Sequence, residues 1–198
     1  NYYIQYAADY NPRLEVLNVS GCTLLTELGC SRGEEDSRSK FTELIFDDCT
    51  SLERVWCDGN ELTSLSLSGC DTLKSLSCYS NKLRTLDLNG CSSLEELYCH
   101  NNKLTSLDLS NCTALTYLEC NDNELTSLSL TQMCPSLRTL LCYNNKLESL
   151  DASGHSALET LSCQSSVLKT VNVSGCTSLI SLQFNDYMNC VVKTVIAS

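Results

Sequence analysis

Proline, histidine and basic residues are scarce in this 198-residue chain. It contains two prolines, two histidines and 13 Lys+Arg against 24 Asp+Glu, which gives a net charge of −11. This acidic balance argues against binding to nucleic acid or anionic lipid, because phosphates would be repelled rather than neutralised. No apolar run approaches the ~18 residues of a membrane-spanning helix, so we expect no membrane insertion. Hydrophobic residues still make up 42% of the chain, enough for a sizeable core.

The apolar residues that are present recur with a period of 21. Residues 73–93 align with residues 94–114 at every apolar position, and Leu76, Leu97 and Leu118 keep that step. Each unit is itself double, with halves of 10 and 11 residues that both read L-x-x-L-x-[L/C]-x-x-[N/C]. Eight first halves begin at Leu25, Leu52, Leu73, Leu94, Leu115, Leu137, Leu158 and Leu179.

This pattern is the leucine-rich-repeat signature, in which a short strand leads into a turn that holds Asn or Cys. The chain resembles the nested 21-residue repeats, of the form L-x-x-L-x-C-x-x-N-x-L-x-x-L-D-L-S-x-N, of secreted and surface proteins from Bacteroidetes-type bacteria. The resemblance implies a secreted or cell-surface recognition module of a bacterium, and it supplies no catalytic residue and no defined ligand. The chain departs from that form by placing cysteine at the second Asn position, at Cys49, Cys70, Cys91, Cys112 and Cys176.

A coil of 21 residues is too short for a strand, a full helix and two turns, so two short strands should fill it. We therefore expect a mainly-β solenoid of about eight coils, with two parallel β-sheets and little or no α-helix. Residues 14–184 should form the solenoid, with a six-residue insertion within 31–40. Terminal coils leave a sheet edge and an open core, so residues 1–13 should form an N-terminal cap. Residues 185–198 should form an irregular last repeat and a C-terminal cap.

The 15 cysteines cannot all pair within one chain, because their number is odd. Seven fall on the first strand of a coil and seven at or beside its second turn. Neighbouring thiols would lie about 4.8 Å apart with parallel Cα–Cβ bonds, which suits neither disulfides nor tetrahedral metal sites. We predict buried free thiols, with the turn thiols donating weak hydrogen bonds in place of Asn. Disulfide bonds and metal ligation are the alternatives.

An asparagine follows the first strand in five successive coils. The side-chain amide both donates and accepts, so it can satisfy backbone groups of adjacent turns. We predict that these residues hold neighbouring coils together and take no part in catalysis. They are Asn60, Asn81, Asn102, Asn123 and Asn145.

Recognisable catalytic and metal-binding motifs are missing. The sequence has no Cys-x-x-Cys, G-x-S-x-G, P-loop or G-x-G-x-x-G motif, and neither His100 nor His155 has a nucleophile beside it. Asp87, Asp108 and Asp151 share one repeat position, but nothing supplies the roughly six to eight oxygens of a calcium site. We therefore expect no enzyme, no cofactor and no metal.

The two outward faces of the predicted coil differ in composition. The second face, made by the second strands, carries Ser, Thr, Asp and Asn at almost every exposed position. The first face, made by the first strands and the residue after each first-strand Cys, contains aromatic residues among polar ones, which is typical of binding sites for proteins or glycans. The alternative is that aromatic stacking between coils only stabilises the sheet. We expect the candidate binding residues to lie exposed on this face or on the turn edge beside it: Trp56, Tyr79, Tyr98, His100, Tyr117, Glu119, Leu141 and Tyr143.

These observations favour a non-catalytic, monomeric recognition module, extracellular or on the cell surface, that binds a protein or glycan through the first face. A net charge of −11 would also suit an acidic inhibitor of a basic enzyme, because it would steer a cationic partner. A passive structural spacer without a ligand is the third alternative. Binding that weakens steeply with salt would favour the inhibitor.

Overall fold

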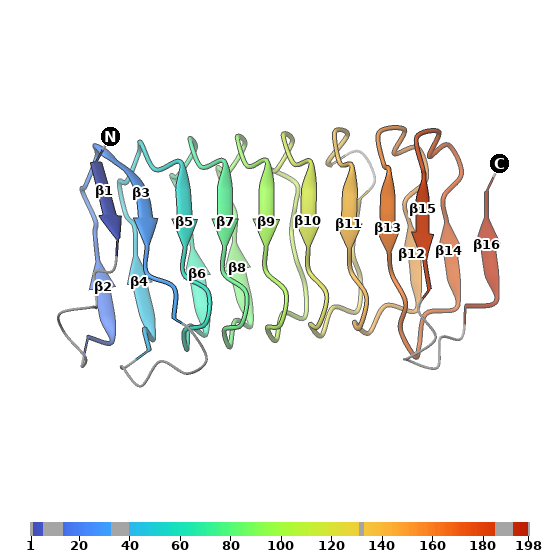
Figure 1. Ribbon diagram of the computed structural model, residues 1–198, viewed down its shortest axis with the longest axis horizontal. Helices are drawn as coiled ribbons and strands as arrows, with labels where there is room; N and C mark the ends of the chain where they lie inside the picture. Colours follow the sequence, from blue (N-terminus) through green and yellow to red (C-terminus); the bar gives the residue numbers. More distant parts are fainter. Residues whose placement is uncertain (1, 6–13, 33–39, 131–132, 185–191, 198) are drawn as a thin grey trace.

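The computed structural model describes residues 2–5, 14–32, 40–130, 133–184 and 192–197. The chain winds into a β-solenoid whose coils stack along one axis, with the two termini at opposite ends (Figure 1). No α-helix occurs among the described residues, and none of them form a helix that could cross a membrane. The predicted parallel-strand solenoid is therefore confirmed.

The first strands of successive coils form one nine-stranded parallel sheet, in the order β1-β3-β5-β7-β9-β10-β11-β13-β15. Neighbouring strands pair in register, so that Leu76 lies opposite Leu97 and the same repeat position forms a row across the sheet. At one edge β1, which precedes the first repeat, pairs with β3. The strands are β1 (Tyr2–Gln5), β3 (Leu25–Gly29), β5 (Arg54–Trp56), β7 (Ser75–Ser77), β9 (Glu96–Tyr98), β10 (Tyr117–Glu119), β11 (Thr139–Leu141), β13 (Thr160–Ser162) and β15 (Ser181–Gln183).

The second side of the solenoid is discontinuous, unlike the single second sheet that the repeat predicts. Its strands form three separate parallel sheets, β2-β4, β6-β8 and β12-β14-β16. Residues 105–109 and 126–130 form no strand, and the Thr126 N–H lies 3.5 Å from the Thr105 carbonyl, a marginal hydrogen bond. The strands are β2 (Val16–Asn18), β4 (Glu43–Ile45), β6 (Ser64–Ser66), β8 (Thr85–Asp87), β12 (Ser149–Asp151), β14 (Thr170–Asn172) and β16 (Thr194–Ile196).

Leucines from both sides of the coil fill the solenoid interior. On the first strands, Leu76, Leu97 and Leu118 are completely buried, and on the second side Leu107 is buried as well. Leu182, in the last described coil of the nine-stranded sheet, is only partly buried. Each coil buries its leucines against its neighbours, so the stability of the stack depends on contacts between adjacent coils.

The asparagines bridge adjacent coils as the sequence predicts. The Oδ1 atom of Asn102 accepts a hydrogen bond from the Leu83 N–H at 2.9 Å. Its Nδ2 donates to the carbonyl oxygens of Cys78, in the preceding coil, and Cys99, in its own coil, both at 3.1 Å. These groups are buried, so the amide satisfies backbone atoms that water cannot reach. The same pattern recurs at Asn60, Asn81, Asn123 and Asn145.

The cysteines are free thiols, which confirms the prediction for the described residues. All are buried except Cys22, which is exposed, and Cys176, which is half-buried. Cys190 lies outside the described residues. Burial raises the pKa of the Cys120 thiol to about 12 and that of Cys70 to about 11. Such thiols stay protonated at neutral pH and are poor nucleophiles.

Turn thiols also replace asparagine as hydrogen-bond donors. The Cys49 Sγ donates to the Val19 carbonyl at 3.1 Å, and the Cys176 Sγ donates to the Ala152 carbonyl at 3.0 Å. Each acceptor belongs to the preceding coil, so a weak donor holds the second turn in the way that asparagine holds the first.

Candidate binding face

Three rows of outward side chains form the first face. Each first strand turns one residue outward before its buried leucine or valine and one after it, because side chains alternate along a strand. The residue after the following Cys adds a third row at the end of the strand. In-register pairing places Trp56, Ser77 and Tyr98 opposite one another on β5, β7 and β9. The row before the leucine runs Arg54, Ser75, Glu96 and Tyr117.

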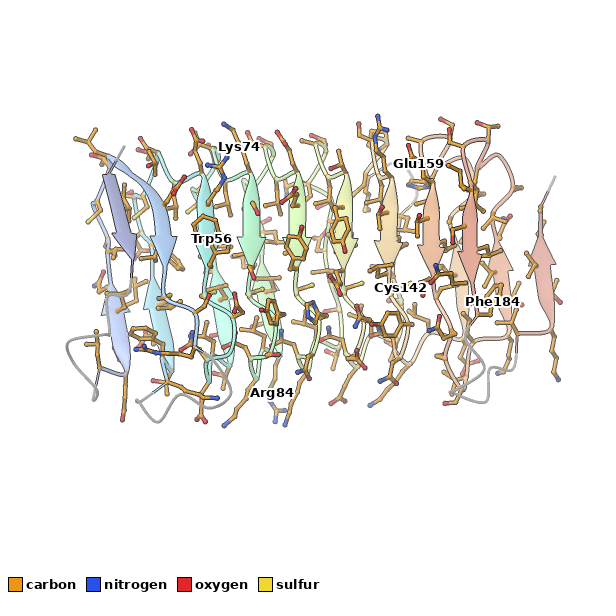
Figure 2. The ribbon with its side chains drawn as sticks, viewed as in Figure 1. Trp56, Lys74, Arg84, Cys142, Glu159 and Phe184 are labelled. Atoms are coloured by element: carbon orange, nitrogen blue, oxygen red, sulfur yellow. The ribbon has the colours of Figure 1, made fainter. Side chains whose placement is uncertain are left out.

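Charged side chains border this face, and Arg54, Glu96 and Glu119 also lie within it among aromatic and short side chains. Lys74, Glu159 and Arg84 project from the turns at the edges of the solenoid, whereas the Trp56 ring lies over the nine-stranded sheet beside β5 (Figure 2).

The structure places all eight candidate residues on this face or at its edge, but it corrects their expected exposure. Each is half-buried rather than fully exposed, because its side chain packs against the face and its neighbours. Trp56, Tyr98, Tyr117, Glu119 and Leu141 are strand residues of β5, β9, β10 and β11, and Tyr79, His100 and Tyr143 lie just beyond strand ends.

Two pairs of rings pack between adjacent coils. Tyr79 stacks on His100 with ring centroids 4.5 Å apart and planes 8° from parallel. Tyr98 and Tyr117 are tilted by 35° with centroids 5.0 Å apart. Stacking therefore stabilises the sheet at these four positions, as the alternative interpretation holds. Trp56 belongs to neither pair, so stacking between described rings does not explain it.

Glu119 joins the two aromatic pairs. Its carboxylate accepts a hydrogen bond from the Tyr117 hydroxyl at 3.2 Å, and its Oε1 lies 3.6 Å from His100 Nδ1. Burial, then the charge of Glu119, raises the pKa of Tyr117 to about 12. His100 Nδ1 and Asn121 Oδ1 are buried without a hydrogen-bond partner among the described residues. Such atoms cost free energy, which the polar groups of a ligand could recover.

A shallow depression of about 350 Å³ opens between Trp56 and Tyr98. Ser77, 6% exposed, lies between these two residues on the middle strand, β7. The sequence analysis named the aromatic residues as binding residues but not the other residues that line the depression. Serine at a position that holds large residues in both flanking coils is a signal that could have identified Ser77. The lining residues that it missed are Arg54, Ser75, Ser77 and Glu96.

A larger depression, of about 440 Å³, lies on the second face between β4 and β6. These two strands belong to different sheets, so the hollow coincides with a break in the ladder. Phe46 is the one aromatic residue of its lining, and that side chain is 3% exposed. We favour the smaller depression as a binding site because it presents accessible aromatic rings, which supply most binding energy per residue.

Comparisons with known proteins identify the repeats. Residues 92–132 and 113–155 match the family described as "Leucine Rich repeats (2 copies)", so the chain contains leucine-rich repeats. No curated protein matches the chain in sequence.

The fold is similar to those of bacterial leucine-rich-repeat proteins. An internalin (InlF) from Listeria monocytogenes matches with 16% identity and a TM-score of 0.51, over 89% of this chain and 62% of that one. A leucine-rich-repeat protein from Leptospira interrogans matches with 18% identity and a TM-score of 0.50, over 100% and 72%. The functional domain of InlJ from Listeria monocytogenes, described as including a cysteine ladder, has 24% identity, a TM-score of 0.46 and coverages of 94% and 46%. The chain thus spans less than two thirds of either Listeria protein.

Proposed function

We propose that this protein is a non-catalytic recognition module that binds a protein ligand through its first face. The observation that carries the proposal is Trp56, a large ring beside a depression, which no packing between described rings explains. Tryptophan and tyrosine provide wide contact surfaces with few rotatable bonds, and they are enriched among the residues that dominate binding energy. Solenoids commonly present such a continuous face to a partner.

We also propose an extracellular or cell-surface location. The proposal rests on the resemblance of the repeats to those of secreted and surface bacterial proteins. Free cysteines are unusual in oxidising surroundings, but burial protects most of these thiols and keeps them protonated. The chemistry of the chain is therefore compatible with that location.

Affinity capture with matched variants tests the proposed function. The full chain is immobilised and exposed to extracts of bacterial and host surface proteins, and a glycan array is probed in parallel. We expect a protein that binds the wild type and Ser106→Ala, on the second face, but binds Trp56→Ala about 5- to 100-fold more weakly. Loss of binding in Ser106→Ala with retention in Trp56→Ala would show that the wrong face was chosen. If glycans bind and no protein does, the ligand of this face is a carbohydrate instead of a protein.

A further inference from the structure

We propose that the depression between Trp56 and Tyr98 is a slot for an arginine side chain of the protein partner. This inference rests on the proposed function, which states that a protein binds this face, and adds the chemical group that the slot receives. The spacing of the strands, the Glu96 carboxylate without an ion pair among the described residues and the acceptor character of Ser77 support arginine.

The spacing admits one planar group. Trp56 and Tyr98 are two strands apart with Ser77 between them, which separates their backbones by roughly 9–10 Å. A flat group stacked between two rings needs about 3.5–4 Å on each side, or about 7–8 Å in total. Gly29, on the other side of Trp56, leaves that flank open too. The strand spacing therefore leaves room for one guanidinium plane between the two side chains.

Glu96 gives the slot a negative charge that no described basic residue neutralises. Its Oε2 accepts a hydrogen bond from the Ser75 hydroxyl at 3.2 Å, and it forms no ion pair within the described part of the chain. Two glutamates of the same sheet region are paired: Glu27 with Arg54 at 2.9 Å and Glu53 with Lys74 at 3.1 Å. Arg54 is the basic residue that lines the depression, but its guanidinium pairs with Glu27 on β3, the strand on the side of β5 away from Glu96.

Asp58 turns the floor of the slot into an acceptor. The hydroxyls of Ser77 and Ser31 both donate to its Oδ1 at 2.8 Å. With its proton committed to Asp58, the Ser77 oxygen can offer only lone pairs to a ligand. Rings, carboxylates and a hydroxyl acceptor suit a planar cation that carries five N–H donors. Lysine lacks the plane of a guanidinium.

Trp56 is the single tryptophan of the chain, so its fluorescence reports on the slot directly. The full chain is titrated with the peptide acetyl-Gly-Gly-Arg-Gly-Gly-amide and with two counterparts that carry lysine or citrulline, the neutral isostere of arginine. We expect a saturable change in emission with the arginine peptide and about tenfold weaker binding of both counterparts. Glu96→Gln should weaken binding of the arginine peptide by a similar factor.

Glu43→Gln is the matched control. It removes the same charge from the first residue of a strand, β4, on the opposite side of the solenoid, and it lies in the rival depression. We expect it to bind the arginine peptide like the wild type, and equal thermal midpoints confirm that both variants fold.

Four outcomes would overturn the proposed arginine slot: no response to the arginine peptide, equal binding of the arginine and citrulline peptides, no effect of Glu96→Gln on peptide binding, or a larger effect of Glu43→Gln than of Glu96→Gln. If the arginine peptide does not bind while capture of the protein partner still depends on Trp56, the assignment of the slot to arginine is wrong and the proposed function stands. If capture also fails, the proposed function falls as well. Quenching of Trp56 by array-selected glycans instead of the peptide would reassign the slot to a carbohydrate.

Discussion

Replacing Asn102 by alanine tests how the coils are held together. The side chain is 9% exposed and makes four hydrogen bonds of 2.9–3.2 Å to backbone groups of its own and the preceding coil, the fourth to the His100 carbonyl. Alanine removes all four at once and leaves the leucine rows untouched.

The cost can be worked out from the remaining partners. The carbonyls of Cys78 and Cys99 each keep a second donor, because Asn81 and Asn123 also bond to them. The Leu83 N–H has no such substitute and becomes a buried unsatisfied donor, which costs about 1–3 kcal/mol. The three lost carbonyl contacts are made by the two N–H groups of one amide, so they add about 0.5–1.5 kcal/mol for each N–H, and we expect a total of about 2–6 kcal/mol.

Urea denaturation with reductant present measures this free energy. Asn111→Ala is the control, because Asn111 is exposed and bonds to the side chain of Asn89, so its loss should cost less than about 0.5 kcal/mol. A cost below about 1 kcal/mol for Asn102→Ala would refute the view that the amide satisfies buried backbone groups.

Three further predictions concern the core and the thiols. Leu97→Ala removes a fully buried side chain and should cost about 2–5 kcal/mol, more than Leu182→Ala in the partly buried last coil. Equal thermal midpoints for wild type and Leu97→Ala would contradict the assignment of Leu97 to the core. An impermeant thiol reagent should label Cys22 and few other residues in native protein, but nearly all 15 cysteines after denaturation without reductant; labelling of only one or three would reveal disulfides. Burial raises the pKa of Cys120 from 9.0 to about 12, so such thiols ionise first in the unfolded chain. Stability should therefore be intact below pH 9 and fall as the pH rises toward 12, and a urea midpoint that stays constant over this range would rule out buried protonated thiols.

The strand register and the asparagine contacts were the most predictable features. A strict spacing of 21 residues brings identical positions to the same place in successive coils, so Leu76 must lie opposite Leu97 once the coil closes. Asn102 then meets the backbone of the coil before it, and its amide has partners on both sides. Repetition thus converts a pattern of residue types into contacts.

The interruptions of the second side could not be predicted from residue types. Thr105 and Thr126 occupy ordinary repeat positions, yet the segments that follow them form no strand. The aromatic face was predicted, but not the half-burial of its rings, which depends on side-chain rotamers. The depression was missed because it depends on the small residue Ser77 between two large ones.

The proposed caps and the insertion remain predictions. Most of residues 31–40 and much of 1–13 and 185–198 lie outside the described residues. Their sequences break the repeat, so the register of the other coils does not predict their structure.

Hydrogen exchange of the chain with and without its captured protein partner tests the central claim most directly. We predict slower exchange of backbone amides in β5, β7 and β9, around Trp56, Ser77 and Tyr98, because a bound partner excludes water from the first face. Amides of β4 and β6 on the second face should exchange at the same rate in both samples. Protection of β4 and β6 with no change in β5 and β9 would contradict recognition through the first face.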